Sequence, residues 1–237
     1  MKVGIISDTH LLLQNHINTD SGDVLIHCGD CLNHGSFKEL PRFIEWFTQQ
    51  RYKHKILVFG NHDFCLDHKD VMIRGSSLSM CADAGIHVLI DRKIEIDGVS
   101  FYGSPWQGSL PHWSAYKDRK ERALLWKKIP EGLDFLITHI PPYGILDKAY
   151  KWTGDKYFYQ TKEPTEHAGS KLLLKEIERA RPKIACWGHI HESRGTTKKN
   201  GITFINAACL DRGYKPWPLP IITLDYNKKE KSCQRSF

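Results

Sequence analysis

The sequence predicts an α/β protein, built as a layered sandwich in which helices flank mixed β-sheets. Three observations support this fold class. Short apolar runs with the length and β-branched content of buried strands recur along the chain, amphipathic stretches with helical spacing lie between them, and a tight-turn signal joins two neighbouring runs. The alternation is typical of helices packed on a central sheet, and the tight turn adds an antiparallel pair, so we expect the sheets to be mixed.

The predicted buried strands are short and rich in valine, isoleucine and leucine, as strands covered on both faces are. They lie at residues 3–6, 24–27, 56–59, 135–137, 184–187, 202–205 and 221–224. A further group of runs, at residues 86–90, 94–96 and 99–102, differs because Asp97-Gly98 separates the last two. This dipeptide favours a tight hairpin turn, so these runs predict antiparallel strands.

Two helices are predicted from apolar periodicity and from their end signals. Residues 36–50 open with Ser36 and carry Glu39 three positions later, which is the spacing of a capping box. Residues 171–180 stop before Pro182, which cannot continue a helix. These helices would cover the faces of the sheet.

Length and composition predict one globular domain spanning residues 1–237. Hydrophobic residues make up 41% of the 237 residues, which supplies a core and is unlike the composition of disordered chains. The first strand meets Asp8 at once, without the long apolar segment of a secretory signal, and no stretch approaches the roughly 20 apolar residues that span a bilayer. We therefore expect a cytoplasmic protein with no membrane partner.

The seven cysteines are predicted to be reduced thiols, because they are odd in number and scattered rather than paired. Cys28 and Cys31 form a C-x-x-C spacing, which is compatible with a redox pair or with half of a zinc site. The chain has no second C-x-x-C, so the interpretation as isolated thiols is favoured.

The formal net charge of +7 predicts attraction to an anionic partner. Much of the excess lies in Lys198, Lys199 and the tail at residues 227–237, so charge alone does not identify a nucleic-acid binder. Residues 147–169 form a long irregular stretch, which is interpreted either as a lid or substrate-binding flap, or as a surface excursion. The sequence makes no prediction of the oligomeric state.

Residue types that bind metals follow five of the predicted strands. They are Asp8-Thr9-His10, Gly29-Asp30, Gly60-Asn61-His62-Asp63, Thr138-His139 and Gly188-His189-Ile190-His191. Loops at the carboxyl ends of strands face one crevice, so these side chains are expected to converge. In an extended segment, side chains two positions apart point the same way. Asp8 and His10 would then point toward one place, and so would His189 and His191. Carboxylate, imidazole and amide ligands suit divalent Mn, Fe, Co, Ni or Zn.

Glycines precede Asp30, Asn61 and His189 in these motifs. We expect them at sharp turns where a Cβ atom would be strained or in the way. Among the remaining histidines, His27, His54 and His87 lie on apolar runs and are expected to be core residues.

The order of these five motifs resembles the calcineurin-like metallophosphoesterase superfamily, over the stretch from Asp8 to His191. The resemblance implies a four-layer α/β/β/α sandwich and a hydrolase acting on phosphate esters. It also implies two divalent metal ions, with Mn favoured. One ion would be held by Asp8, His10 and His191, the other by Asn61, His139 and His189, and Asp30 would bridge them.

The resemblance further implies a mechanism. Two ions about 3.5 to 4 Å apart share a water, lower its pKa and clamp the phosphoryl oxygens, so that the bridging hydroxide is the nucleophile. His62 would face the substrate and stabilise charge or protonate the leaving group. Asp63 would either orient His62 or serve only as a turn former or surface charge.

Within the superfamily, the chain is most similar to small metallophosphodiesterases related to class III cyclic-nucleotide phosphodiesterases and to the adult-brain-protein type. The similarity lies in residues 29–33, 102–107, 138–142 and 188–192. Protein phosphatases of the superfamily carry Asp-Arg-Gly after the bridging aspartate, where this chain has Asn33-His34-Gly35. This difference argues against a protein phosphatase.

The leading functional prediction is a phosphodiesterase for a small organic or cyclic-nucleotide phosphate ester. A nuclease acting on DNA or RNA is the alternative, and a non-catalytic protein-binding scaffold is a third. Trp106 and the loop to Trp113 would either stack on a nucleobase or pack within the protein. Asn33 and His34 would either touch the substrate or form a turn.

Overall fold

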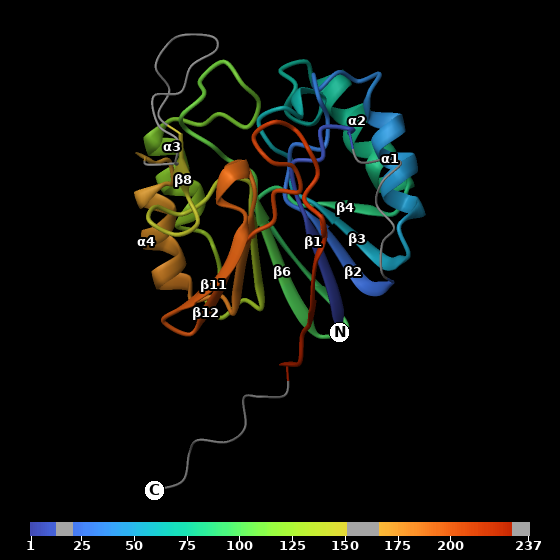
Figure 1. Ribbon diagram of the computed structural model, residues 1–237. Helices are drawn as coiled ribbons and strands as arrows, with labels where there is room; N and C mark the ends of the chain where they lie inside the picture. Colours follow the sequence, from blue (N-terminus) through green and yellow to red (C-terminus); the bar gives the residue numbers. More distant parts are fainter. Residues whose placement is uncertain (13–20, 151–165, 229–237) are drawn as a thin grey trace, which may run out of the picture.

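The computed structural model describes residues 1–12, 21–150 and 166–228 (Figure 1). Two large β-sheets face each other, and helices cover the outer face of each (Figure 1). The helices are α1 (Leu40–Gln49) and α2 (Val71–Asp83) on one side, and α3 (Arg119–Trp126) and α4 (Lys171–Ala180) on the other. This four-layer arrangement confirms the predicted fold class.

The first sheet has the strand order β13-β1-β2-β3-β4. Its strands are β1 (Lys2–Ile6), β2 (Gly22–His27), β3 (Tyr52–Leu57), β4 (Ile86–Val88) and β13 (Ile222–Asp225). Strands β1 to β4 run parallel, and β13 pairs with β1 in the antiparallel direction. Parallel pairing brings the carboxyl ends of β1, β2 and β3 to one edge of the sheet.

The second sheet has the order β11-β12-β10-β7-β6-β5. Its strands are β5 (Arg92–Ile96), β6 (Val99–Ser104), β7 (Phe135–Thr138), β10 (Ile184–Trp187), β11 (Gly195–Lys199) and β12 (Ile202–Asn206). The four central strands are parallel and the two edge strands antiparallel. Ile96 lies opposite Val99, so the hairpin predicted at Asp97-Gly98 is confirmed.

Alternate residues of the strands form the core between the two sheets. Val3 and Ile5 of β1 are fully buried there, and the rings of Phe101 and Phe135 stack at 4.9 Å in the same cluster. The opposite strand faces pack against helix residues such as Phe43 and Ile177, both buried. Strands covered on both faces explain the nearly continuous apolar runs in the sequence.

Helix α1 begins later than the predicted residue 36. Leu40 is its first residue, and Glu39 is the N-cap. Pro41 has no N–H to donate to the carbonyl four residues earlier, so the hydrogen-bonded helix cannot extend further back at that point. The Glu39 carboxylate does accept the Ser36 amide at 3.3 Å, which is half of the expected capping box. Helix α4 matches its predicted range, with Ser170 as its N-cap.

The helices α2 and α3 and the edge strand β11 were not predicted. Helix α2 includes Gly75 and two following serines, which weaken its apolar pattern. Helix α3 opens with a complete capping box between Asp118 and Glu121. Among the described residues, no helix is long and apolar enough to cross a membrane.

The ends of the predicted loop at residues 147–169 are described, whereas residues 151–165 lie outside the described part of the chain. Two-residue strands β8 (Lys148–Ala149) and β9 (Glu166–His167) pair at its base. Asp147 accepts a hydrogen bond from the Nδ1 of His167 at 2.7 Å, which closes this base. The role of the loop as a lid or a surface excursion stays a prediction.

Candidate metal centre

The metal-ligand residues predicted from the sequence converge at the carboxyl ends of β1, β2, β3, β7 and β10. Ligand atoms within each of three groups lie within 4.8 Å of one another. The groups are Asp8 with His10 and His191, His10 with Asp30 and His62, and Asp30 with His139 and His189. Asn61 joins them, because its Oδ1 lies 2.9 Å from the Nε2 of His139. His10 and Asp30 each belong to two groups, so the site is continuous.

The backbone at the site is left-handed rather than extended. Asp8 (φ 57°), His10 (φ 44°), Asp30 (φ 53°) and His189 (φ 68°) all have positive φ. The expectation that extended segments aim pairs of ligands was therefore wrong. Sharp turns at the strand ends bring the side chains together, and non-glycine residues in this region are strained unless their surroundings hold them.

Hydrogen bonds between the loops hold these turns in place. The amide of Asp8 donates to the carbonyl of Gly29 at 2.9 Å, and the amide of His10 donates to the carbonyl of Asp30 at 3.1 Å. The amide of His189 donates to both carboxylate oxygens of Asp8 at 3.0 Å. The first sheet and the second sheet are thus joined directly through a candidate ligand.

Two of the glycines allow a close approach that any side chain would prevent. A Cβ atom on Gly60 would lie 2.2 Å from the Oδ1 of Asp30, and one on Gly188 would lie 2.0 Å from the Oδ2 of Asp8. Both distances are far inside van der Waals contact. The expected reason for these glycines is confirmed.

Three imidazoles of the site share one orientation, with Nδ1 beside a backbone carbonyl. The pairs are His62 with Asn33 at 2.7 Å, His139 with Cys28 at 2.9 Å, and His191 with Asp211 at 3.1 Å. A carbonyl oxygen only accepts, so each Nδ1 carries the hydrogen and donates it. In the neutral tautomer the Nε2 of each ring then has a free lone pair, which is the arrangement of a metal-binding histidine.

Two of these histidines form close ion pairs with carboxylates. The Nε2 of His139 lies 3.4 Å from the Oδ1 of Asp30, and the Nε2 of His191 lies 3.5 Å from the Oδ1 of Asp8. Burial lowers the pKa of each histidine, but the carboxylates outweigh it and raise both pKa values to about 9. Burial raises the pKa of Asp8, and the hydrogen bond with His191 reverses this and brings it to about 2.

His10 lies at the centre of the site with unused bonding capacity. Its side chain is 1% exposed, and within the described part of the chain neither ring nitrogen has a hydrogen-bond partner. Burial lowers its pKa to about 4, so the ring is neutral. A buried polar atom without a partner is costly, and a cation that accepts the imidazole lone pair removes this cost.

The donor atoms of the site suit divalent first-row metal ions. They are carboxylate oxygens, imidazole nitrogens and one amide oxygen. Together with the unpartnered nitrogens of His10, this set shows that the residues present fit divalent metals.

The C-x-x-C cysteines take no part in this set. Burial raises the pKa of both thiols, Cys28 packs in the core between the sheets, and the Cys31 sulfur donates to Asp63 at 3.3 Å. All six cysteines in the described residues are free and buried, in line with the prediction of reduced thiols.

Asp63 contacts backbone amides rather than the imidazole of His62. Its carboxylate accepts the amides of Gly60 at 2.8 Å, Leu32 at 2.9 Å and Cys31 at 3.3 Å. These bonds join the two loops that carry Asp30 and Asn61. Asp63 was predicted either to orient His62 or to form a turn, and these contacts match the turn former. Asp63 is linked to His62 only through the backbone.

The neighbouring Asn33-His34 turn is held from both sides. The carbonyl of Asn33 accepts from His62, and the amide of His34 donates to the Glu39 carboxylate at 3.0 Å. His27 is a satisfied core residue as predicted, because its Nδ1 accepts the Gly29 amide at 3.2 Å and its Nε2 lies 3.0 Å from the Thr9 hydroxyl. Both observations place these residues in the scaffold of the site.

Trp113 and Tyr214 border the site, whereas Trp106 does not, and Tyr214 was not predicted from the sequence. Trp106 is only 7% exposed and donates to Asp91, so it packs within the protein. Trp113 is 39% exposed, and its ring lies 4.6 Å from that of His62. Tyr214 lies 5.1 Å from His10 and belongs to a loop that gave no sequence signal.

Comparisons with known proteins agree with this arrangement. The family model described as calcineurin-like phosphoesterase matches residues 1–193. A UPF0046 protein of Caenorhabditis elegans is 36% identical over 231 residues, covering 94% of this chain and 74% of the relative. Metallophosphoesterase domain-containing protein 1 of Homo sapiens is 32% identical over 236 residues, covering 92% of this chain and 68% of the relative. Phosphopantetheinyl hydrolase from Mycobacterium tuberculosis shares the fold, with a TM-score of 0.64 and 15% identity over 96% of each chain.

Proposed function

Since this chain belongs to the calcineurin-like phosphoesterase family, and is thus a hydrolase of phosphate esters, we propose that it is a metal-dependent phosphodiesterase acting on a small organic phosphate ester. The observation that carries this proposal is His10, a buried neutral imidazole whose two ring nitrogens make no hydrogen bond among the described residues. It lies between two carboxylates that other histidines already partner.

In this proposal the site holds two divalent ions. Asp8, His10 and His191 hold the first, Asn61, His139 and His189 hold the second, and Asp30 lies between the two sets. Bound there, the ions supply the acidity that activates water near neutral pH and the positive charge that phosphoryl oxygens require. The backbone carbonyls on His139 and His191 keep Nε2 of each ring directed at this space.

His62 is proposed as the catalytic acid. Its Nδ1 donates to the carbonyl of Asn33, and its amide donates to the Oδ1 of Asp30 at 2.8 Å. The ring is thereby fixed beside the candidate metal ligands, with Nε2 available to carry a proton to the leaving alkoxide. Asp63 acts as a positioning residue, because it holds the Leu32 amide next to Asn33.

The first test measures initial rates on bis(p-nitrophenyl) phosphate and p-nitrophenyl phosphate after metal removal and restoration with Mn, Ni, Co, Fe or Zn. Bound metal is counted in parallel by mass spectrometry, for the natural chain and for Asp30→Ala. For the natural chain we expect two ions per chain and faster hydrolysis of the diester. In Asp30→Ala we expect loss of bound metal and loss of activity. Full metal occupancy without turnover would contradict an enzyme and favour the scaffold alternative.

The role of His62 is tested by the leaving group. Nitrophenolate leaves without a proton, whereas an alkoxide needs one, so His62→Ala should slow alkyl diesters far more than bis(p-nitrophenyl) phosphate. General acid catalysis typically contributes about 10²–10⁴-fold. His87→Ala, on β4, is the matched control and should affect both substrates equally little. Equal losses on the two substrates would assign His62 a role other than proton donation.

A nuclease is the second candidate, and the net charge of +7 favours it. Binding to a nucleic acid weakens steeply with salt because it releases counterions, whereas a small phosphate ester shows little such dependence. Hydrolysis of single-stranded DNA and RNA measured between low and moderate salt separates the two candidates. A steep salt dependence together with turnover would replace the small-ester proposal.

A further inference from the structure

We propose that Trp113 and Tyr214 determine specificity at this site, and that they select phosphate esters whose organic group carries a planar aromatic ring. The inference rests on the proposed function and names its substrate class. Both rings border the candidate metal centre, Trp113 beside His62 and Tyr214 beside His10 and His191.

Trp113 lies next to the residue proposed to protonate the leaving group. Its ring centroid is 4.6 Å from that of His62 and 5.9 Å from that of Phe64, and the residue is 39% exposed. An organic group leaving from the phosphorus toward His62 therefore meets the tryptophan ring. Aromatic faces hold planar rings by stacking, without regard to their hydrogen-bonding pattern.

One buried side chain cross-links the loop that carries Trp113. Gln107 is fully buried, and its amide oxygen accepts from Ser109 at 3.0 Å and from Leu110 at 2.9 Å. Its amide nitrogen donates to the carbonyls of Leu110 at 2.8 Å and Ser114 at 3.1 Å. These four hydrogen bonds restrain the loop, and a restrained loop lowers the entropy cost of binding.

The same loop is bonded directly to the metal-ligand motif. The amide of Ser114 donates to the carbonyl of Asn61 at 3.1 Å, and its hydroxyl donates to the carbonyl of Asp63 at 3.4 Å. These bonds attach the loop that carries Trp113 to the residues on either side of His62. Its exposed ring is part of the site rather than a random surface aromatic residue.

Tyr214 borders the site from a tight loop. Its ring lies 5.1 Å from that of His10 and 5.4 Å from that of His191, yet the residue is 46% exposed. Its φ of 59° is left-handed, and its amide donates to the carbonyl of Asp211 at 3.0 Å. That same carbonyl accepts from the Nδ1 of His191, so the loop that presents Tyr214 also orients a candidate ligand.

Tyr214 lies outside residues 1–193, the part of the chain that the family model matches. Its assignment therefore comes from the geometry alone. The rings of Trp113, His62, His10 and Tyr214 follow one another at 4.6, 4.6 and 5.1 Å across the site. Both exposed rings therefore lie within reach of an organic group on a phosphate at the candidate metal centre.

The test measures binding, not turnover, by titration calorimetry of the Mn-loaded chain with phenylphosphonate, cyclohexylphosphonate and methylphosphonate. The carbon–phosphorus bond of these compounds is not a phosphate ester, so affinity is read without hydrolysis. Stacking of about 1–3 kcal/mol corresponds to roughly 5- to 150-fold in affinity, which we expect phenylphosphonate to gain over methylphosphonate. Cyclohexylphosphonate has a similar apolar area without a planar face and should gain less.

Variants assign this preference to the two rings. Trp113→Ala and Tyr214→Ala should each reduce the phenyl preference several-fold, while Trp113→Phe and Tyr214→Phe should keep most of it. Trp217→Ala is the matched control, because Trp217 is also exposed, at 36%. Unchanged affinity for methylphosphonate in every variant shows that the candidate metal centre stays folded. Comparison of adenosine monophosphate with ribose 5-phosphate then tells a nucleoside from a simple aryl group.

Three outcomes overturn the inference, and they are distinguishable. Equal affinity for phenyl-, cyclohexyl- and methylphosphonate, or an undiminished preference in Trp113→Ala and Tyr214→Ala, overturns the inference alone. Failure of the Mn-loaded chain to bind any phosphonate or inorganic phosphate overturns the proposed function and the inference with it.

Discussion

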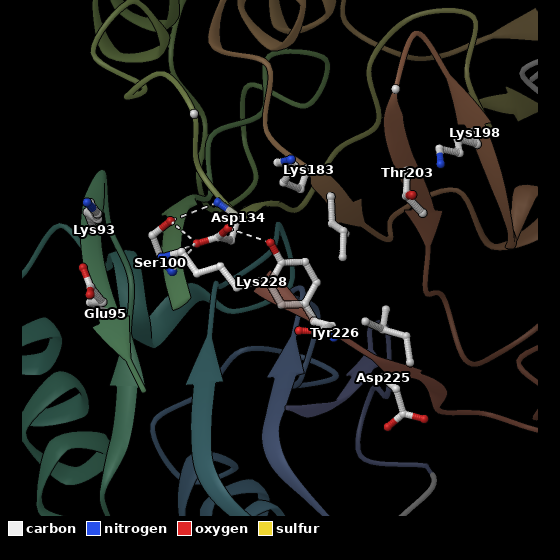
Figure 2. Close-up of a pocket in the computed structure, with 15 residues that line it drawn as sticks. Lys93, Glu95, Ser100, Asp134, Lys183, Lys198, Thr203, Asp225, Tyr226 and Lys228 are labelled. Carbon is white, nitrogen blue, oxygen red and sulfur yellow. Dashed lines mark hydrogen bonds and ion pairs between the residues drawn. The ribbon is translucent and has the colours of Figure 1, made fainter. Parts of the chain in front are cut away.

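Two regions of the molecule each hold a buried aspartate among cations, yet only one has the features of a reaction site. The metal centre lies at the carboxyl ends of the strands. At the opposite, amino ends lies a cavity of about 610 Å³, with Asp134 at the start of β7 beside it (Figure 2). Lysines line this cavity, namely Lys93, Lys183, Lys198 and Lys228.

The difference between the two regions is in how their polar atoms are satisfied. Asp134 is 5% exposed, and its Oδ2 accepts from the amide and the hydroxyl of Ser100, both at 2.9 Å. Its Oδ1 accepts from the Tyr226 hydroxyl at 2.6 Å, and Lys228 lies 3.4 Å away (Figure 2). His10, by contrast, is buried, and neither of its ring nitrogens makes a hydrogen bond in the described structure.

The volume of a cavity therefore does not identify its chemistry. The cavity beside Asp134 is large, but its carboxylate is saturated with donors and ties the C-terminal strand to the second sheet. The candidate metal centre combines ring nitrogens that make no hydrogen bond with left-handed backbone at several candidate ligands. Unsatisfied polar atoms and stored strain are costs that a folded chain keeps where a ligand compensates for them.

The largest effect is expected when the charge of Asp30 and that of Asp134 are removed separately. Asp30→Asn should lower kcat/KM by roughly 10²–10³-fold or more, the scale seen when a charge-stabilising group at a reacting centre is removed. Asp134→Asn should leave the rate within about twofold but lower the free energy of unfolding by about 1–3 kcal/mol. The side-chain NH2 of the asparagine would face hydrogen-bond donors instead of acceptors. Rates and urea unfolding on both variants check this. A large rate loss in Asp134→Asn would give the second region a catalytic role.

The close approach at Gly60 offers the next test. Gly60→Ala places a methyl group 2.2 Å from the Oδ1 of Asp30, so the carboxylate must move. A displacement of about 1 Å costs on the order of 10²-fold in rate. Gly75→Ala in α2 has open space around the new methyl group and should leave the rate unchanged while stabilising the helix. Activity retained in Gly60→Ala would show that the site tolerates a shifted Asp30.

The ion pairs of the site predict opposite pH trends with and without metal. The pKa values of His139 and His191 are raised to about 9, above the value of about 6.5 in an unfolded chain. The folded metal-free chain therefore binds the additional protons between these values, and the resulting stability is complete below pH 6.5 and lost as pH rises toward 9. Metal must displace the same protons, so its affinity rises over that window.

Thermal unfolding at pH 6.5, 7.5 and 8.5, with a chelator and with Mn, measures both trends. The chelated chain should show a falling Tm, and the increase in Tm that Mn produces should grow with pH. A chelated Tm that rises over this range would contradict the charge assignment of the two histidines.

The smallest effect concerns the saturated region. Tyr226→Phe removes one donor from Asp134 and should cost about 1 kcal/mol of unfolding free energy, the net contribution of a typical hydrogen bond. Catalytic rates should not change, because the residue lies at the amino ends of the strands. Chemical denaturation gives the stability, and a loss well above 3 kcal/mol would show that Tyr226 supports more than this one contact.

Much of the fold and of the site could be predicted because both depend on local patterns. Buried strands are apolar over their whole length, and their ends carry the polar residues, so the run at residues 3–6 and the candidate ligand Asp8 appear together. Helix α2 could not be predicted, because Gly75 and its neighbouring serines dilute the apolar periodicity and tertiary packing decides its conformation.

The parts of the site that could not be predicted depend on contacts distant in sequence. The left-handed conformation of Asp8 is imposed by bonds to Gly29 and His189, which no local pattern reveals. Tyr214 comes close to His10 only because its loop folds back onto the site. Trp106 and Trp113 look alike in the sequence, and only the structure distinguishes the buried ring from the exposed one.

The backbone carbonyls that face His62, His139 and His191 have a consequence for evolution and for engineering. Main-chain atoms are the same in every residue, so point mutations at Asn33, Cys28 or Asp211 leave these acceptors in place. The protonation pattern of the three rings is thus encoded by chain geometry and is robust to sequence drift. Altered metal preference would have to arise from the ligand side chains themselves, and only replacement of a peptide amide by an ester would weaken the acceptors.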